Sequence, residues 1–222
     1  MNKDLFEFLN ALKENNNKEW FDANRKNYED CKANLVVFLS DVIAQTAKFD
    51  KSIIGVDAKK SIFRINRDVR FSKNKNPYKT NMGALLSAGG KKGLRAGYYL
   101  HFEPNATLLG AGIWMPETAV LNKVRQEIDY NSKEFLKIVE NKNVLELFGG
   151  IDKSESLKTM PRGYDVTLPY AEYLKLKSFT FFKKLSNKEV MSKDFNAQVV
   201  NCFKAMQPLN NFLNRVIDEV NE

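Results

Sequence analysis

The sequence predicts an α+β fold, in which a mostly antiparallel sheet, a meander of about four or five strands, is packed by N-terminal and C-terminal helices. Two observations predict it. Apolar residues recur every three or four positions toward both ends of the chain, as on one side of a helix. Between the ends they form short runs separated by turn residues, as in strands. No repeat or linker divides the chain, so residues 1–222 are expected to form a single α+β domain.

Helices are predicted for the first fifty residues. Apolar residues at helical spacing mark the first helix: Leu5, Phe6, Leu9 and Leu12. The asparagines at 15–17 interrupt the pattern, and Asn17 is placed to cap a second helix that ends before Asp50. Three aromatic residues of this second helix are expected to pack in the core: Trp20, Phe21 and Tyr28.

Strands are predicted in the middle of the chain and once more near its end. They cover residues 61–66, 82–88, 97–103, 107–114 and 179–185. Residues 89–93, which contain three glycines, and the Pro104-Asn105 pair are turn signals between consecutive strands. Such short connections favour an antiparallel meander, because parallel strands need a crossover of roughly a dozen residues or more.

The helical pattern returns after the predicted meander, at residues 117–131 and 135–139. Residues 149–170 show no period and are expected to be irregular. The last thirty residues are predicted to be helical, with one apolar stripe before Pro208 and another after it.

Composition excludes several classes of protein. The chain has 43% hydrophobic and 28% charged residues, which is ordinary for a globular domain. Its start mixes charged and apolar residues, so no signal peptide is expected. No apolar run approaches the length of a bilayer span. The protein is therefore predicted to be cytoplasmic, with no membrane partner.

Cysteine and histidine are too sparse for metal chemistry. Cys31 and Cys202 lie far apart and outside any C-x-x-C pair, so two reduced thiols are expected. One histidine and two isolated cysteines cannot assemble a zinc site, and no metal or cofactor is predicted. Nothing in the sequence indicates an oligomeric state.

Positive charge is concentrated in residues 59–95. This window holds eleven Lys and Arg residues against Asp68 alone, a net charge of +10, whereas the whole chain carries +8. The rest of the chain is therefore slightly negative. A charge this local is typical of a site that meets an anion, such as an anionic small molecule or nucleic acid.

Three of the eight arginines lie within seven residues of this window. Guanidinium groups present a planar fork of donors that grips phosphate or carboxylate. Lysines on the following loop and an aromatic ring that could stack on a base complete the predicted ligand-binding set, which is Arg64, Arg67, Arg70, Lys75, Tyr78 and Lys79. Phe71, in the same segment, is expected to pack in the core.

Three residues are candidates for proton transfer. Asp68 is the one acid of the window, and it would either orient an arginine through an ion pair or act as a base. His101 is the only histidine, and in a strand it would share one face with Tyr99 and Glu103. An imidazole and a carboxylate on one face can form an acid–base pair.

The residues leave three interpretations open. In the first, the Arg-rich segment at 64–79 binds a phosphate-bearing or other anionic ligand, nucleic acid among them. In the second, the protein is an enzyme for a small anionic substrate, with Asp68, His101 or Glu103 moving protons. In the third, the arginines and Asp68 form a structural ion-pair network without a ligand.

The segment also resembles a known family. The run Arg64-x-x-Arg67-Asp68-x-Arg70-Phe71-x-x-Asn74-Lys75-x-x-Tyr78 resembles the signature of bacterial proteins grouped as domain of unknown function 2461. Further segments that fit are residues 15–28, residues 97–103, Gly110-x-Gly112, Arg125 and residues 161–165. The resemblance covers nearly the whole chain. It implies a single intracellular domain of similar length, and it implies no activity, cofactor or catalytic residue.

Overall fold

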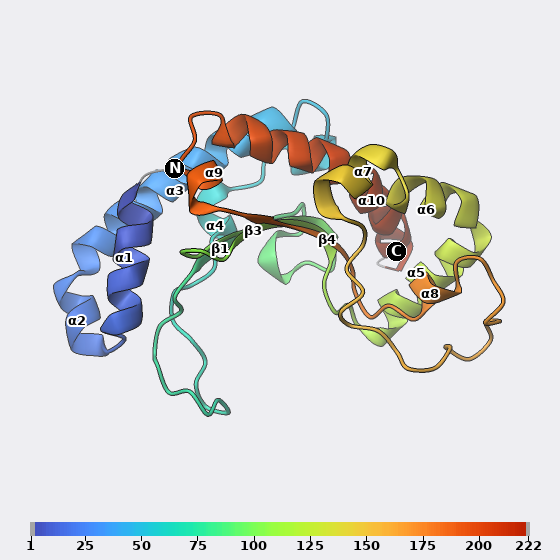
Figure 1. Cartoon of the computed structure of the whole chain (residues 1–222), viewed down its shortest axis with the longest axis horizontal. Helices are drawn as coiled ribbons and strands as arrows, with labels where there is room; N and C mark the ends of the chain where they lie inside the picture. The colour runs from blue at the N-terminus through green and yellow to red at the C-terminus, as the bar shows by residue number, and fades with distance from the viewer. Residues whose placement is uncertain (1–2, 221–222) are drawn as a thin grey trace.

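The sheet of the computed structural model, which describes residues 3–220, has four antiparallel strands in the order β1-β2-β3-β4 (Figure 1). The strands are β1 (Met82–Leu86), β2 (Gly97–Phe102), β3 (Thr107–Ile113) and β4 (Phe179–Leu185). The predicted α+β meander is confirmed. The strand predicted at 179–185 has the same bounds in the structure. It pairs with β3 although residues 114–178 separate the two strands.

Helices flank the sheet in the sequence. Before the sheet lie α1 (Lys3–Glu14), α2 (Lys18–Ala23), α3 (Arg25–Thr46), the 3-10 helix η1 (Lys51–Ile53) and α4 (Ala58–Ser61). A second 3-10 helix, η2 (Gly90–Lys92), lies between β1 and β2. Between β3 and β4 lie α5 (Thr118–Tyr130), α6 (Ser132–Val139), α7 (Lys142–Phe148) and α8 (Ala171–Leu174). The chain continues after β4 with α9 (Asn187–Val190) and α10 (Phe195–Val220).

The N-terminal helices follow the prediction closely. Asn17 caps α2, since its side chain accepts a hydrogen bond of 2.9 Å from the backbone N–H of Trp20. The second predicted helix is divided at Asn24 into α2 and α3. The structure adds α7 to the predicted elements, because seven residues are too few to show a helical period.

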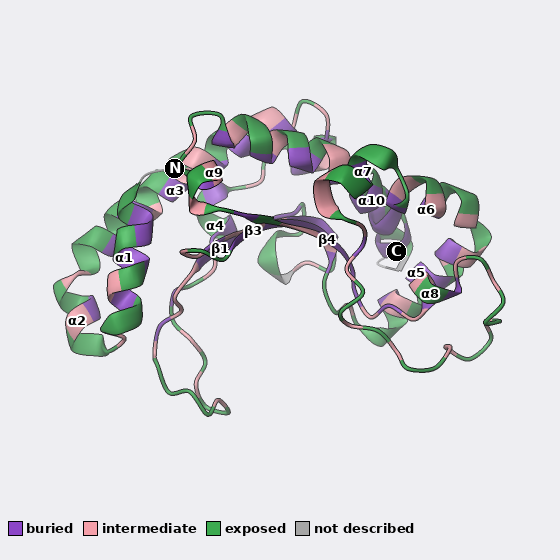
Figure 2. Cartoon of the chain, in the orientation of Figure 1, coloured by how far each residue is buried: buried purple, intermediate pink, exposed green. Residues whose placement is uncertain are grey.

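One face of the sheet is buried beneath α3 and α10 (Figure 2). Tyr98, Leu100 and Phe102 alternate along β2 on this core face, and all three are fully buried. Phe203 of α10 stacks on Tyr98 with 4.5 Å between ring centroids. Both apolar stripes predicted around Pro208 lie on α10, because packing on each side of the proline keeps the helix continuous.

The opposite face of the sheet, which we call the open face, carries smaller and more exposed residues. They alternate with the buried ones and include Gly83, Leu85, Gly97, Tyr99, His101, Leu108, Gly110, Gly112 and Phe182. Four of these are glycines, and at each of them neighbouring atoms lie close to the place that a Cβ would take. The two faces of the same four strands therefore present opposite surfaces, one filled with large side chains and one hollowed.

Residues 62–81 form a long hairpin that leaves the edge of β1 and projects from the body (teal in Figure 1). The strand predicted at 61–66 is wrong as a continuous strand. Only Ile62 and Asn66 of that range form bridges, and both bridges are isolated.

Side chains take over the acceptors that a ladder would use. The carbonyl of Ile62 accepts a hydrogen bond from Lys91 Nζ, and the carbonyl of Arg64 accepts one of 2.9 Å from Lys79 Nζ. The segment makes one backbone hydrogen bond to β1, from the N–H of Phe63 to the carbonyl of Gly83 at 2.9 Å, and does not continue as a regular strand. The lysines thus fix the direction in which the hairpin leaves the sheet.

The described residues bear on two further predictions. Within residues 3–220, no helix combines the length and apolar character that a bilayer crossing requires. The buried apolar side chains form one continuous core that runs from α1 to α10. The single-domain assignment of residues 1–222 stays a prediction, and its four terminal residues lie outside the described range.

Candidate functional site

The foot of the hairpin, where it meets the sheet, gathers cations around the ring of Phe63. Lys79 Nζ lies 5.7 Å and Lys91 Nζ lies 5.6 Å from the ring centroid. Cations near an aromatic face are attracted by its electron density, so Phe63 helps to hold both lysines. Lys79 also contacts the backbone of Arg64. We call Arg64, Lys79 and Lys91 the cation cluster.

The cation cluster has no carboxylate partner of its own. None of the ion pairs formed by the described residues includes any of its three members. Burial lowers the pKa of Lys79 from its ordinary value of 10.5, and the charges of Arg64 and Lys91 lower it further. Arg64 also contributes, as the smallest cause, to a lowered pKa of Asp68 on the hairpin. A partly buried ammonium among like charges is stabilised by any anion that reaches it.

The arginines toward the tip of the hairpin are engaged within the hairpin itself. Arg67 donates from Nη1 to the carbonyl of Asn76 and from Nη2 to Ser72 Oγ, both at 3.2 Å. Arg70 holds Asp68 in a bidentate pair, with Nε–Oδ1 at 3.0 Å and Nη2–Oδ2 at 2.7 Å. The hydrogen bonds from Arg70 hold the pKa of Asp68 below its usual range. Asp68 thus orients an arginine, the structural role predicted for it.

Other residues of the hairpin divide between packing and exposure. Lys75 Nζ turns back and donates to the carbonyl of Val69 at 3.0 Å. Tyr78 is buried, and its ring stacks on Phe21 of α2 with 4.1 Å between centroids. Its ring therefore attaches the hairpin to the N-terminal helices. Phe71 is 95% exposed, and the expectation that it packs in the core is wrong, because the hairpin carries it away from the body.

A chain of hydrogen bonds crosses the open face next to the foot of the hairpin. Tyr99 Oη lies 3.1 Å from His101 Nδ1, and His101 Nε2 lies 3.0 Å from Glu103 Oε2. Thr80 Oγ1 donates to Glu103 Oε1 at 2.8 Å. Tyr99 and His101 share one face of β2 as predicted, and Glu103 lies directly after the strand and reaches His101. The Tyr99 ring also packs edge-on against Phe63, with 6.2 Å between ring centroids. The hydrogen-bonded residues are thus connected to the ring that holds the two lysines of the cation cluster.

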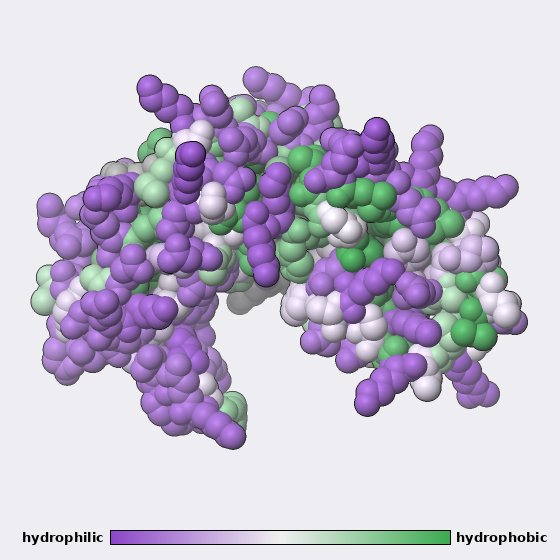
Figure 3. Space-filling view, viewed as in Figure 1, coloured by the Kyte–Doolittle hydropathy of each residue, from purple (hydrophilic) through white to green (hydrophobic). Residues whose placement is uncertain are grey.

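The open face is the floor of a cleft with a volume of about 530 Å³. The foot of the hairpin and η2 contribute Phe63 and Lys91, and the sheet contributes Tyr99 and Phe182. Trp114, directly after β3, lies on its rim and is 57% exposed. In Figure 3 the outline of the molecule is open between the hairpin and the lobe that contains α5 to α8.

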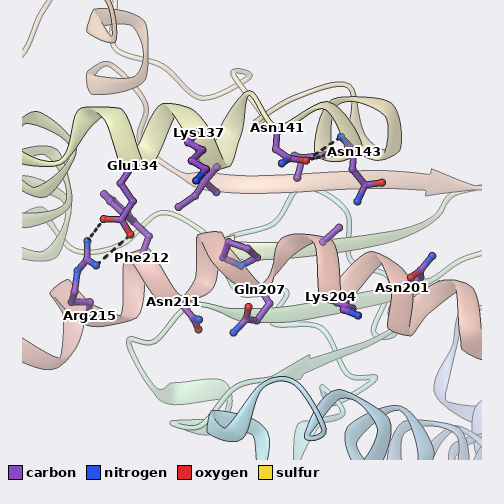
Figure 4. A pocket seen from close by; sticks show the side chains of 14 residues that line it. Glu134, Lys137, Asn141, Asn143, Asn201, Lys204, Gln207, Asn211, Phe212 and Arg215 are labelled. Atoms are coloured by element: carbon purple, nitrogen blue, oxygen red, sulfur yellow. Dashed lines mark hydrogen bonds and ion pairs between the residues drawn. The ribbon is translucent and has the colours of Figure 1, made fainter.

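A second hollow, of about 720 Å³, lies between α6, α7 and α10 (Figure 4). Amide side chains supply much of its lining, namely Asn141, Asn143, Asn201, Gln207 and Asn211. Its one arginine, Arg215, is paired with Glu134 at 3.0 Å and with Glu127 at 2.5 Å. This groove contains no residue of the basic window, and its guanidinium is already neutralised, so the open-face cleft is the stronger candidate.

The structure brings together some of the predicted site residues and separates others. Arg64 and Lys79 meet in the cation cluster, whereas Arg67 and Arg70 are turned to partners in the hairpin. Of the catalytic candidates, His101 contacts Glu103 and Asp68 is paired with Arg70. Among the described residues, no group of three or more potential ligands is placed to hold a metal ion.

Sequence reasoning missed the residues that connect the cluster to the cleft. Lys91 lies inside the basic window, but it falls on a predicted turn and so was absent from the predicted binding set. The cleft has a sequence signal as well. Gly110 and Gly112 are two positions apart on a predicted strand, so neither places a side chain on the face of the sheet that they share.

A family model described as Conserved hypothetical protein (DUF2461) matches residues 4–212 of the chain. No curated protein and no solved structure matches it. The family match includes the hairpin, the open face and most of α10. Because it covers nearly all of the 222 residues, the chain belongs to the DUF2461 family, as the resemblance in its sequence implies.

Proposed function

We propose that the protein binds a phosphate-bearing anion at the cation cluster formed by Arg64, Lys79 and Lys91. The observation that carries the proposal is the position of Lys79, whose ammonium is partly buried beside two further cations. Keeping that ammonium charged is unfavourable until an anion compensates it. A phosphate group offers this compensation together with several strong acceptor oxygens.

The donors that a phosphate needs are present in the cluster. Lys79 and Lys91 each use an N–H on a backbone carbonyl, which fixes the position of the ammonium. A lysine ammonium has three N–H donors, so each retains further donors for a ligand. The exposed guanidinium of Arg64 makes no side-chain hydrogen bond within residues 3–220. It is free to add a planar, two-pronged contact.

Isothermal titration with inorganic pyrophosphate at low ionic strength tests the proposal. We expect Lys79→Met and Lys91→Met each to weaken binding by about tenfold or more. The control is Lys75→Met, which removes the same charge from the exposed part of the hairpin and should change the affinity less than about twofold. Equal losses for all three variants, or no binding of pyrophosphate by the unmodified protein, would contradict a specific site.

The exposed tip favours a second candidate, in which the phosphate belongs to nucleic acid. Phe71 is almost fully exposed, and the Arg70 guanidinium carbon lies 5.8 Å from its ring centroid. Exposed rings among cations stack on unpaired bases while the cations follow the backbone. In this form, phosphates would follow the hairpin from Arg70 past Lys75 to Lys79, within the predicted binding set.

Fluorescence anisotropy with labelled single- and double-stranded oligonucleotides separates the two candidates. Nucleic-acid binding should weaken steeply as salt increases, because counterions are released from the phosphates. Phe71→Ser should then weaken single-stranded binding several-fold and leave pyrophosphate binding unchanged. Pyrophosphate binding without salt-sensitive oligonucleotide binding would assign the cluster to a small ligand.

A further inference from the structure

We propose that the ligand of the cation cluster carries a planar aromatic body, and that this body occupies the open-face cleft. The inference rests on the proposed function, because it places the phosphate at the cluster. It adds the chemical class of the ligand, which is a phosphorylated aromatic molecule of about the size of a mononucleotide. The cleft volume of about 530 Å³ lies within the usual range for small-molecule sites.

Glycines let the β4 side of the cleft floor pack closely against β3. A Cβ atom on Gly110 would lie 2.7 Å from two ring carbons of Phe182, so the ring occupies the space that a side chain would fill. Gly112 has φ of +119°, and a Cβ there would clash with the carbonyl oxygen of Phe179. These positions accept glycine alone without rearrangement. The Phe182 ring therefore lies against β3 as part of the cleft floor, where a planar group can stack on it.

Aromatic and apolar side chains surround this floor. Tyr99, Phe182 and Trp114 supply rings, and Trp114 meets Phe182 edge-on at 6.2 Å. Large apolar residues that remain exposed elsewhere on the protein lie scattered, but Leu94, Trp114 and Met115 meet at this one cleft. Exposed apolar side chains gathered around a hollow mark a binding site. Rings of this kind stack on planar groups.

The rim that holds Trp114 is fixed by the backbone. Met115 has φ of +44°, a left-handed conformation that is unfavourable for a residue with a side chain. Its N–H is held by a hydrogen bond of 2.9 Å from the Met115 nitrogen to Ser178 Oγ. Strain retained at the edge of a cleft is typical of a functional position. Here it keeps the indole at the mouth of the cleft.

Two residues join the cleft to the cation cluster. Phe63, at the foot of the hairpin, and Lys91 of η2 both line the cleft, and Lys91 Nζ lies near the Phe63 ring. A phosphate held by Lys91 and Lys79 therefore has its ester-linked group at the mouth of the cleft. Arg95 also lines the cleft, but it is paired with Asp218, so Lys91 supplies the uncompensated charge there.

Polar atoms within the cleft can orient such a ligand. Thr180 lines the cleft and is buried, and its Oγ1 has no hydrogen-bond partner among the described residues. Glu117 contributes the one carboxylate among the lining residues. The Thr180 hydroxyl can donate a hydrogen bond to a ring nitrogen, and the Glu117 carboxylate can accept one from a hydroxyl or amino group of the ligand.

Binding of adenosine 5′-monophosphate, adenosine and inorganic phosphate to the full chain tests the inference. The background variant Trp20→Phe makes Trp114 the sole tryptophan, so its fluorescence reports on the cleft. We expect the monophosphate to bind roughly ten- to a hundredfold more tightly than phosphate, from about 100 Å² of buried apolar surface. We also expect it to quench Trp114.

Variants separate the two parts of the site. In the background with both tryptophans, Trp114→Leu and Phe182→Leu should remove most of the preference for the monophosphate over phosphate. Tyr130→Leu, which changes an exposed ring on α5 outside the cleft, is the matched control and should have no effect. Lys79→Met should weaken phosphate and the monophosphate alike.

Each outcome decides between the two proposals. Equal binding of phosphate and monophosphate, with unchanged Trp114 emission, overturns the occupied cleft and leaves the anion site in place. Binding of the monophosphate and adenosine with equal affinity, unaffected by Lys79→Met, overturns the anion site and with it this inference. If neither phosphate nor the monophosphate binds, both proposals are overturned.

Discussion

The two faces of the same sheet present opposite surfaces. On the core face of β2, Tyr98 and Leu100 have no exposed surface and are covered by helices. On the open face, glycines alternate with partly exposed rings, and cations from the hairpin stand at the edge. Alternate residues of the same strands make up the two faces. One set of positions fills the core, and the other set lines the cleft.

Under the proposed function, the core face carries stability and the open face carries ligand binding. Large side chains on the core face bury apolar surface, which is the main favourable contribution to folding. On the open face, the Phe182 ring and the backbone of β4 occupy the space that side chains at Gly110 and Gly112 would fill. Lys79 adds an unfavourable burial of charge at the margin. Positions that lower stability without a packing reason are expected at functional sites.

The largest expected effect on stability is a difference between substitutions on the two faces of the sheet. Leu100→Ala on the core face should lower the free energy of unfolding by about 2–5 kcal/mol, because it leaves a cavity in the core. Leu85→Ala on the open face should lower it by less than about 1 kcal/mol. Urea unfolding of both variants measures the contrast. Similar losses would show that the open face also carries the fold.

A smaller effect is expected at Gly110, which lies under the Phe182 ring of the cleft. Gly110→Ala should lower the free energy of unfolding by about 1–3 kcal/mol, because the new methyl group displaces the Phe182 ring. The same change in a Phe182→Leu background should be less harmful, since the ring that clashes is gone. A double-mutant cycle by urea unfolding measures this coupling. Additive effects would contradict the contact between ring and floor.

Lys79 should connect stability to pH. Its pKa is lowered in the folded state, so the unfolded chain binds the proton more tightly. Between the lowered pKa and the ordinary value of 10.5, stability should therefore rise with pH at this position, and below both values the unfavourable burial is fully present. Lys79→Met should be slightly more stable than the unmodified protein near neutral pH, by less than about 1 kcal/mol.

Chemical unfolding at several pH values checks this prediction. The advantage of Lys79→Met should shrink as the pH approaches 10.5. Lys75→Met, whose charge lies on the exposed hairpin, should show no such trend. A variant that is less stable than the unmodified protein at neutral pH would mean that the contact with Phe63 outweighs the burial of charge.

The smallest effect concerns the tip of the hairpin. Phe71→Ser should change the free energy of unfolding by less than about 0.5 kcal/mol, because the ring is 95% exposed. Phe21→Ser, which removes the ring that stacks on Tyr78, should cost several times more. Thermal unfolding of the two variants compares the free and the attached parts of the hairpin. A marked loss for Phe71→Ser would place its ring in a contact absent from the structure.

Much of the fold follows from local signals in the sequence. Asn17 marks the start of α2. The alternation of buried and less buried residues from Tyr98 onward assigns each residue of β2 to a face of the sheet. The hairpin could not be derived in this way. Its course depends on Lys79 and Lys91, whose side chains occupy backbone acceptors of residues 15 and 29 positions away. Such long-range contacts leave no period in the sequence.

The site was predictable in charge and not in geometry. The basic window contains all three members of the cation cluster, because net charge is a property of composition. The choice of Arg67 and Arg70 as ligand residues remains a proposal, and the structure turns both toward hairpin partners. Which cations lack a carboxylate partner depends on the fold, because the carboxylates that could pair with them come from distant parts of the chain.

The self-contacts of the hairpin have a thermodynamic consequence. Arg67, Arg70 and Lys75 tie the projecting segment to its own backbone and side chains, and Tyr78 fastens its base. A segment already ordered in this way gives up little conformational freedom when it meets a partner. The hydrogen bonds of Arg67 and Arg70 therefore pre-organise the hairpin, and binding of a partner there would cost less conformational entropy.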